Sequence, residues 1–526
     1  MMTIKRISPG SAYRYYLRQV VVGDGQRKGR NKSLSDAQDE AGVPAGEWIG
    51  RALPALGVAG AVTEAQMRSL FGEGLHPEAD RIAAELSAVG AGPAEVLRAV
   101  KLGYALRSKT GKGGSVVAWD CVFRPPASVT LLWAFGTGAV PGIIDRAHIV
   151  ALTKTVEWLE GHALIVRSGA GSKVRKPARP GVVAARFRHF DSRDQKPLLH
   201  DHVVISVKVQ REDGKWAHLH GRVLLENAVA AGALYNQLVL EEVCAALGLA
   251  TRPRIATPGK RPVMEIAGVP DELIDWTSTR NEATMRRLGE LVDAYRARTG
   301  REPGPRLRSR LMARAAQEER PPKKEIVPLP VLRARWRTEA LALFGADVID
   351  WLLELARRAA SMIRARVRAV LNVSCAAVDV AKPVYVHHGV FRYRHLLAEA
   401  RRHVAQTSLG ERTEPDMAER IARQAVHTYC LDINQHGGDS KAPRVTDYTT
   451  YTGTWDPTPP GAAAVQVSRL TKEQRARIAG LQRQAELRQA DLHRARVGDT
   501  VLQPAPPSAR PRHSEPESPT RSLRPS

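Results

Sequence analysis

Three histidines occur in a spacing that suits a metal ion. His189 is followed by His200 and His202, and the last two open an apolar run rich in β-branched residues. Residues two apart on a strand point to the same face, so His200 and His202 can present both imidazoles to one ion. Residues 183–188 also read as a strand, and a connection through 191–197 would bring His189 beside the pair. Three neutral imidazoles would form a metal site with open positions for substrate, whereas a lone histidine is more often a hydrogen-bonded structural residue.

A carboxylate is expected inside an apolar strand. Asp120 lies within residues 115–123, whose other members are mostly apolar or aromatic. Burying a carboxylate is costly unless it has a partner, so two interpretations stand: a salt bridge to an arginine, or a place in a functional site.

Tyrosines are concentrated near the N-terminus. Tyr13, Tyr15 and Tyr16 fall on an expected helix over 12–21, after a short alternating strand at 3–7. Residues three apart share a helix face, so Tyr13 and Tyr16 are expected to pack together while Tyr15 points elsewhere.

The composition indicates a soluble protein that binds a polyanion. In 526 residues, 79 Lys and Arg outnumber 54 Asp and Glu, which gives a net charge of +25. Nucleic acid is favoured over a membrane surface as partner, because no amphipathic anchor or lipidation signal accompanies the charge. With no signal peptide and no run of about 18 apolar residues, we expect a cytoplasmic protein without membrane insertion.

Other classes of protein are disfavoured by what the sequence lacks. The four cysteines, Cys121, Cys244, Cys375 and Cys430, are far apart and form no CxxC pair. This argues against a disulfide framework and a zinc knuckle. No phosphate-binding Gly-x-x-x-x-Gly-Lys-Ser/Thr loop occurs, so a nucleotide-hydrolysing motor is not indicated.

Periodicity and turn residues predict a mixed fold that becomes helical toward the C-terminus. Strands are expected at 3–7, 115–123, 181–209 (a pair), 215–220 and 262–266, and helices at 12–21, 48–71 (two pieces), 77–103 (a pair), from 128, at 141–168, 226–248 and 270–300. Residues 302–330 read as a basic, Pro-containing connector. The basic amphipathic helix at 347–370 presents either a solvated face or a DNA contact, the former being preferred. A polar helix is expected at 471–496 and a disordered Pro-rich tail after it.

Several local patterns resemble conjugative relaxases of the TrwC/TraI (MobF) type. They are the segment from His189 to His202, the segment from Asp120 to Val129, and matches at 48–60, 232–237 and 265–270. These matches run in family order over roughly residues 1–340.

The resemblance implies an α+β fold, an antiparallel-sheet palm of the HUH-endonuclease kind with flanking helices. It implies a relaxase domain at 1–340, and we assign 341–455 to an α-helical domain of unknown role. Residues 456–526 are assigned to a linker, the polar helix and the disordered tail.

The resemblance also implies a mechanism and its residues. Tyr15 falls where the family's nucleophile belongs, with Tyr16 as its neighbour, and Asp120 matches an acidic residue near the site. A tyrosine would attack the scissile phosphate to form a 5′-phosphotyrosine, and His189, His200 and His202 would hold a divalent metal ion. Magnesium or manganese is favoured by resemblance, and zinc stays open.

The implied partners are single-stranded DNA of a transfer origin, a coupling protein with its secretion apparatus, and a separate helicase. Three positions depart from the family pattern: Ala37 and Gln38 replace a second tyrosine pair, and Ala127 replaces a lysine. These departures keep an origin-binding protein with impaired catalysis as one alternative. A rolling-circle replication-initiation nickase, which uses the same chemistry on a different target, is another.

Overall fold

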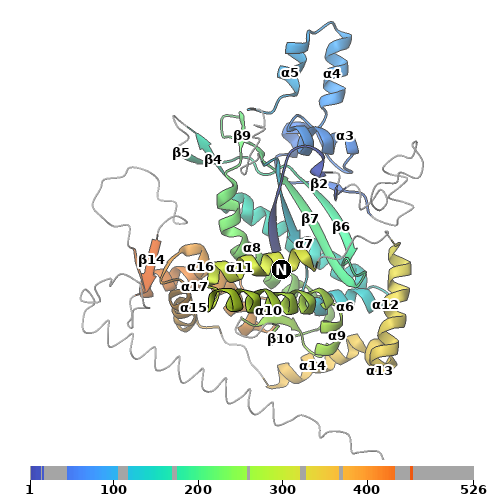
Figure 1. Cartoon of the computed structure of the whole chain (residues 1–526), viewed down its shortest axis with the longest axis vertical. Coiled ribbons are helices and arrows are strands. Elements are labelled where there is room, and N and C mark those ends of the chain that lie inside the picture. The colour runs from blue at the N-terminus through green and yellow to red at the C-terminus, as the bar shows by residue number, and fades with distance from the viewer. Residues whose placement is uncertain are drawn as a thin grey trace, which may run out of the picture. The chain divides into compact units, whose positions relative to one another are not determined.

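The fold is built on a sheet whose strand order differs from the order in the chain. The structure is a computed structural model that describes residues 2–13, 15–16, 44–104, 116–168, 174–256, 261–319, 327–366, 371–432 and 450–453. Five strands form one antiparallel sheet in the order β1 (Met2–Ile7), β3 (Ala118–Phe123), β7 (Pro197–Ser206), β6 (Ala184–Asp191) and β2 (Glu47–Ile49) (Figure 1). The strand that carries Asp120 is thus the direct neighbour of β7. The predicted α+β fold with an antiparallel sheet and flanking helices is confirmed.

The region 48–71 begins differently from the prediction. Trp48 was expected on a helix, but it lies in β2 and pairs with Ala185 of β6. The strand ends at Gly50, which has φ of 115°. Any side chain at this position would place its Cβ atom against the backbone oxygen of Val182. The short helices η2 (Leu53–Leu56), α3 (Glu64–Met67) and η3 (Arg68–Glu73) follow.

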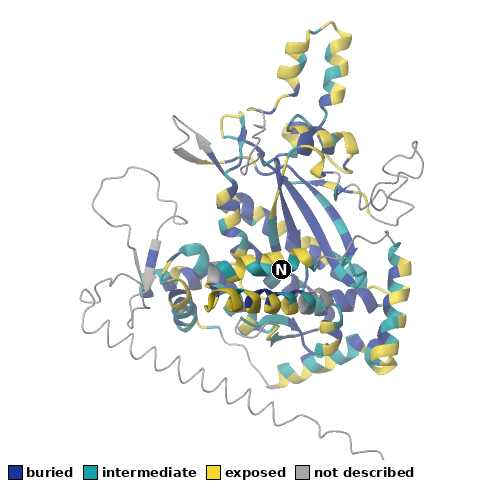
Figure 2. Cartoon of the chain, viewed as in Figure 1, coloured by how far each residue is buried: buried dark blue, intermediate teal, exposed yellow. Residues whose placement is uncertain are grey.

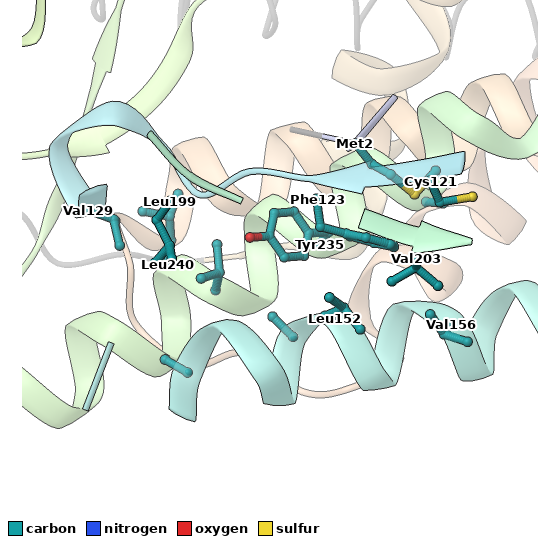
Figure 3. Packing of buried hydrophobic residues seen from close by; sticks show 14 of the residues in the cluster. Met2, Cys121, Phe123, Val129, Leu152, Val156, Leu199, Val203, Tyr235 and Leu240 are labelled. Atoms are coloured by element: carbon teal, nitrogen blue, oxygen red, sulfur yellow. The ribbon is translucent and has the colours of Figure 1, made fainter. Parts of the chain in front are cut away.

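One face of the sheet forms the main core with two long helices, α7 (Val140–His162) and α8 (Gly221–Leu247). Cys121, Phe123 and Val203 alternate with residues of the other face and are fully buried against Leu152 of α7 and Tyr235 of α8 (Figure 3). Figure 2 shows the central strands β3, β6 and β7 as mostly buried. The helix expected at 141–168 ends at His162, earlier than predicted. The last residues of that range form β4 (Ile165–Ser168), which pairs with β5 (Val174–Pro177).

The opposite face is covered at one end by the N-terminal segment. Tyr13, in η1 (Ser11–Tyr13), and Tyr16 are buried in one apolar cluster with Phe187 of β6 and Val204 of β7. Tyr15 is only half-buried. The prediction that Tyr13 and Tyr16 are packed is confirmed, but Tyr15 does not point elsewhere, because it packs against the same cluster from a less buried position.

A buried acid fixes the helix that follows β3. Glu265, in β11 (Val263–Ile266), accepts hydrogen bonds from the backbone N–H and hydroxyl of Ser128, at 2.9 and 2.5 Å. Ser128 lies in the first turn of α6 (Ala127–Phe135), where a carboxylate interacts favourably with the helix dipole. Strand β11 pairs with β10 (Thr251–Arg254) and is followed by α9 (Asp271–Trp276).

The expected connector at 302–330 is not entirely irregular, and this prediction was wrong in part. It contains the helix α11 (Pro305–Glu318), which packs against α10 (Thr279–Thr299) through Leu288, Leu291 and Ala315. Gly300 ends α10 in a left-handed conformation and Pro305 opens α11, an arrangement that favours two helices over one. The expected helix at 270–300 is likewise divided into α9 and α10.

The basic segment at 347–370 has a contact that neither of its two interpretations anticipated. It contains α14 (Leu352–Arg366), after α12 (Leu329–Phe344) and α13 (Ala346–Ile349). Arg357 donates to the carbonyl of Leu247, and Arg364 donates to those of Gly248 and Leu249. These carbonyls lie at the C-terminal end of α8, where cations are favourable. At least two of its arginines therefore fix α14 to α8.

The predicted helical region toward the C-terminus is also present. It comprises α15 (Val373–His388), α16 (Tyr393–Ser408) and α17 (Met417–Tyr429), with the small sheet β12 (Val390–Arg392), β14 (Thr450–Gly453) and β13 (Cys430–Asp432). Arg401 of α16 is buried over the ring of Trp158 and donates to the carbonyl of Ala230 and to Glu419. The α16 helix is thus joined to α7 and α8.

The remaining described elements are short or lie at the periphery. The expected helix pair at 77–103 is α4 (Ala79–Ala88) and α5 (Pro93–Val100), which stand apart from the sheet (Figure 1). Strand β8 (Lys208–Gln210) pairs with β9 (Trp216–His218), and all four cysteines are free. By length and composition, α8 is the one helix in the described ranges that could cross a membrane, but 56% of its apolar window is buried in the protein. This makes it a core helix, as its packing against α7 and β1 indicates.

Several expectations lie wholly or partly outside the described residues. These are the positions Ala37 and Gln38, residues 14 and 17–21 of the helix expected at 12–21, the polar helix expected at 471–496 and the expected C-terminal tail.

Candidate metal centre and tyrosine site

The two central strands bring the three histidines together. In the β6–β7 register His189 is opposite His200, and Phe187 is opposite His202, so all three imidazoles lie on the face of the sheet that carries the tyrosines. One ligand atom from each histidine lies within 4.8 Å of the others, and all three side chains are buried. The ring centroids are 4.8 to 5.2 Å apart. This is the only cluster among the described residues with the geometry to hold a metal ion through three such side chains.

Hydrogen bonds at Nδ1 orient two of the rings. His202 Nδ1 lies 2.8 Å from Oδ1 of Asp120, and His200 Nδ1 lies 2.8 Å from the carbonyl oxygen of Leu198. In each pair the imidazole N–H donates to the oxygen, which leaves Nε2 as the ligand atom. Metal-binding histidines are commonly held in this way by a carboxylate or a carbonyl.

Burial keeps the imidazole of His200 neutral. Removal from water, together with the nearby His202, lowers the pKa of His200 to about 3, so its imidazole is neutral at physiological pH. Neutral imidazoles are the form that binds metal. The donor set, three buried imidazoles of which two have an oriented Nε2, therefore fits a divalent metal ion.

Asp120 connects the histidines to the tyrosines. It is 4% exposed and bonds to His202 rather than to an arginine. Its charge also acts on the nearby Tyr16 hydroxyl, because burial together with this carboxylate raises the pKa of Tyr16. Of the two interpretations of Asp120, the place in a site agrees better with these contacts than the salt bridge to arginine.

The two adjacent tyrosines differ in environment. Tyr16 is 4% exposed and its ring stacks on Phe187. Tyr15 is half-buried, packs edge-on against Tyr16 at 5.2 Å, and lies 6.1 Å from the His202 ring. Tyr15 is therefore the one with more access to a ligand.

Sequence reasoning missed two charged residues beside this site. Arg124 directly follows β3 and lies two residues after Val122 and four after Asp120, so alternation places it on their face of the sheet. Its charge contributes to the lowered pKa of His200. Asp201, between two of the histidines, is buried on the other face. The alternation of strand residues could have indicated both positions, but not their contacts.

The loop that joins the histidine strands is held by α12. Trp336 Nε1 donates to the carbonyl of Gln195 at 2.6 Å, and Arg335 donates to the Gln195 side chain at 2.7 Å. Lys196 bonds to Glu339 at 2.6 Å. Gln195 has φ of 59°, a conformation that these contacts help to stabilise.

Other positions noted in the sequence are placed as follows. Ala127 is half-buried at the start of α6. His218 lies with its Nε2 3.1 Å from the buried amine of Lys208. His220 precedes α8 and is not in the metal cluster.

A family comparison covers most of this region. The TrwC relaxase family model matches residues 9–343. Among curated proteins, the chain is 30% identical over 195 residues to the multifunctional conjugation protein TraI of Escherichia coli, covering 35% of this chain and 10% of TraI. It is 28% identical over 254 residues to TraI of Escherichia coli strain K12, covering 46% of this chain and 12% of that protein. The chain thus matches about a tenth of the length of these relatives.

Solved structures of the same kind also align. A metal-bound conjugative relaxase TrwC in complex with oriT DNA is 23% identical, with a TM-score of 0.46, and covers 65% of this chain and 98% of its own. A copper-bound TrwC complex with oriT DNA is 24% identical, with a TM-score of 0.45 and the same coverage.

Proposed function

Because the chain belongs to the TrwC relaxase family, whose model matches residues 9–343, we propose that it nicks one DNA strand at a transfer origin and later rejoins it. The observation that carries this proposal is the position of Tyr15, with its ring 6.1 Å from that of His202 in a cluster of three buried imidazoles. A nucleophile and a cation site are thus adjacent, as phosphoryl transfer requires.

The proposed reaction is a transesterification. The Tyr15 oxygen attacks the scissile phosphorus, the bond from phosphorus to the 3′ oxygen breaks, and the phenolic proton is lost while the 3′ oxygen gains one. The products are a 5′-phosphotyrosine and a free 3′-hydroxyl, so no co-reactant is consumed. The reverse reaction, attack by a 3′-hydroxyl on the phosphotyrosine, rejoins the strand.

His189, His200 and His202 would hold a divalent metal ion. Such an ion supplies polarisation of a non-bridging phosphate oxygen and neutralisation of the charge that develops there. Imidazole ligands suit transition metals, so manganese or zinc agrees with the donor set, and magnesium agrees with the resemblance. Comparing cleavage in these three ions would decide among them.

Asp120 and Tyr16 are assigned supporting roles. Asp120 orients His202 through Nδ1, and burial together with its charge raises the pKa of Tyr16, so the Tyr16 hydroxyl stays protonated. Tyr16 in turn packs against the Tyr15 ring. This arrangement favours Tyr15 as the nucleophile and Tyr16 as the residue that positions it.

The proposed partners follow from charge and family. A net charge of +25 suits the phosphate backbone of the single-stranded DNA that a relaxase holds. We further propose that a coupling protein, its secretion apparatus and a separate helicase act with this chain in the cytoplasm.

The test is nicking of a supercoiled plasmid that carries the transfer origin of the element encoding this chain. Wild type and Tyr16→Phe are expected to nick it, and Tyr15→Phe is expected not to. A labelled origin oligonucleotide should become covalently attached to wild type and to Tyr16→Phe, but not to Tyr15→Phe. Undiminished nicking by Tyr15→Phe would exclude the assigned nucleophile. Cleavage only at a replication origin would indicate a rolling-circle initiator, and binding without cleavage would indicate an origin-binding protein.

A further inference from the structure

The residue between two of the metal-site histidines has a distinct environment. Asp201 follows His200 and precedes His202 on β7, so alternation directs its side chain to the opposite face of the sheet. That side chain is 0% exposed. A carboxylate so deeply buried must be compensated by several partners.

The negative charge of Asp201 is compensated first by two arginines of β6, the neighbouring strand that carries His189. Arg188 Nε lies 2.8 Å from Asp201 Oδ1, and Arg188 Nη2 lies 3.1 Å from Oδ2, which is a two-point contact. Arg186 Nη1 also lies 2.9 Å from Oδ2. Both arginines belong to β6, and Arg188 immediately precedes His189. One carboxylate therefore links β6 to β7 at the level where the three imidazoles converge on the other face.

The same carboxylate is connected to the two helices beneath the sheet. His148 of α7 lies with Nε2 3.4 Å from Asp201 Oδ1, and its Nδ1 lies 2.6 Å from the hydroxyl of Tyr235 of α8. Tyr235 packs edge-on against Phe123, a neighbour of Asp201 in the β3–β7 register (Figure 3). The sheet, α7 and α8 thus share one buried polar network.

Each arginine also has an outer acidic partner. Arg186 bonds to Glu47 of β2, and Arg188 bonds to Asp145 of α7 at 2.9 Å. Loss of the Asp201 charge would leave both guanidinium groups with a counterion. What would be lost is the direct link between the two strands that carry the histidines.

Strand register decides whether the histidines can meet. His189 is opposite His200, and a shift of one residue would direct one strand's imidazoles to the other face. The β6–β7 pairing is already irregular between His189 and Asp191. Contacts that fix this register next to the irregularity therefore control the spacing of the metal ligands.

We propose that Asp201 is a positioning residue of the metal site. Through Arg186 and Arg188 it holds the two histidine strands in the register that brings the three imidazoles within reach of one ion. It acts from the opposite face and does not touch the ion or DNA. The ion itself rests on the proposed function.

The test measures metal affinity of the full chain without DNA. Co²⁺ is titrated and followed by its visible absorption, and unfolding by urea is recorded for each variant. Asp201→Asn is expected to bind Co²⁺ ~10–100-fold more weakly and with an altered absorption band, as loss of groups that orient ligands does elsewhere. Arg188→Lys, which keeps the charge but loses the two-point contact, is expected to weaken binding in the same direction.

The matched control is His148→Phe, which removes the link to α7 and Tyr235 but leaves the contacts of Asp201 with both arginines. It is expected to lower resistance to urea while Co²⁺ affinity stays within ~2-fold, since its ligands keep their orientation. Unchanged Co²⁺ affinity in Asp201→Asn would overturn the proposal, as would equal weakening in His148→Phe. If Asp201→Asn does not fold, Arg188→Lys decides in the same way.

Failure of this inference can be distinguished from failure of the proposed function. If wild type binds Co²⁺ but does not nick DNA, the function is refuted and the role of Asp201 stands. If wild type nicks DNA and Asp201→Asn binds Co²⁺ like wild type, the reverse holds. If wild type binds no Co²⁺, the positioning role is refuted together with the metal site.

Discussion

Asp120 Oδ1 lies 2.8 Å from Nδ1 of His202. Burial and the charge of the same carboxylate raise the pKa of the nearby Tyr16 hydroxyl, so one buried acid acts on both the metal cluster and the tyrosine segment. These two parts of the site are far apart in the sequence, and each is positioned with reference to this one side chain.

Asp120→Asn is expected to weaken divalent metal binding by ~10–100-fold, because an amide orients an imidazole N–H less strongly than a carboxylate. Isothermal titration with Mn²⁺ would measure the change. Asp347→Asn removes an exposed acid of α13 and should leave the affinity unchanged. Equal affinity in Asp120→Asn and wild type would contradict the assigned role.

Arg124→Ala is expected to reduce DNA binding and cleavage, since Arg124 follows Asp120 and Val122 in the β3 series and its charge reaches His200. Loss of one phosphate contact should reduce the slope of the logarithm of the binding constant against the logarithm of the salt concentration by about one unit. Fluorescence anisotropy with an origin oligonucleotide at several salt concentrations measures this. Arg6→Ala, at an exposed position on β1 in the opposite alternation, is the control. The same loss of slope in both variants would mean that Arg124 contributes only general charge.

Glu265→Gln is expected to change how stability depends on pH. Burial raises the pKa of Glu265 above its ordinary value of 4.5, so its contribution to stability is fully present below that value. The contribution is lost as pH rises through the raised folded-state pKa. The glutamine variant should therefore gain stability relative to wild type as pH increases from about 4.5 toward neutral. Urea unfolding of both proteins across this range tests the sign, and a constant difference between them would contradict it.

Trp336→Ala is expected to lower the free energy of unfolding by ~3–5 kcal/mol, the usual cost of removing a buried aromatic side chain. Trp336 is 0% exposed, contacts Trp133 and bonds to Gln195 in the loop of the histidine hairpin, which is formed by β6 and β7. Trp351→Ala, at a position 58% exposed, should cost within about 0.5 kcal/mol. Denaturant unfolding measures both. Similar losses in the two variants would show that α12 is not a significant support of the hairpin.

Local patterns predicted much of the fold because alternation and turn residues act over short distances. The strands at 3–7 and 115–123, the histidine hairpin and the α4–α5 pair are present as expected. The errors occurred where local signals are weak or misleading. Trp48 lies in a three-residue edge strand that pairs with the distant β6 and bridges to Ala61 through Glu47. The helix α11 was obscured by the basic residues and prolines around it.

The sequence by itself determined which groups could perform chemistry: three histidines with strand spacing, an acid inside an apolar strand, and adjacent tyrosines. It also determined that His200 and His202 share a face, because strand alternation is a local property. Only the tertiary structure decided that Asp120 bonds to His202 and acts on Tyr16, and that Asp201 bonds to two arginines. It also decided that Trp336 holds the hairpin. Those contacts join residues distant in the chain, and they depend on strand order and helix packing, which no local pattern specifies.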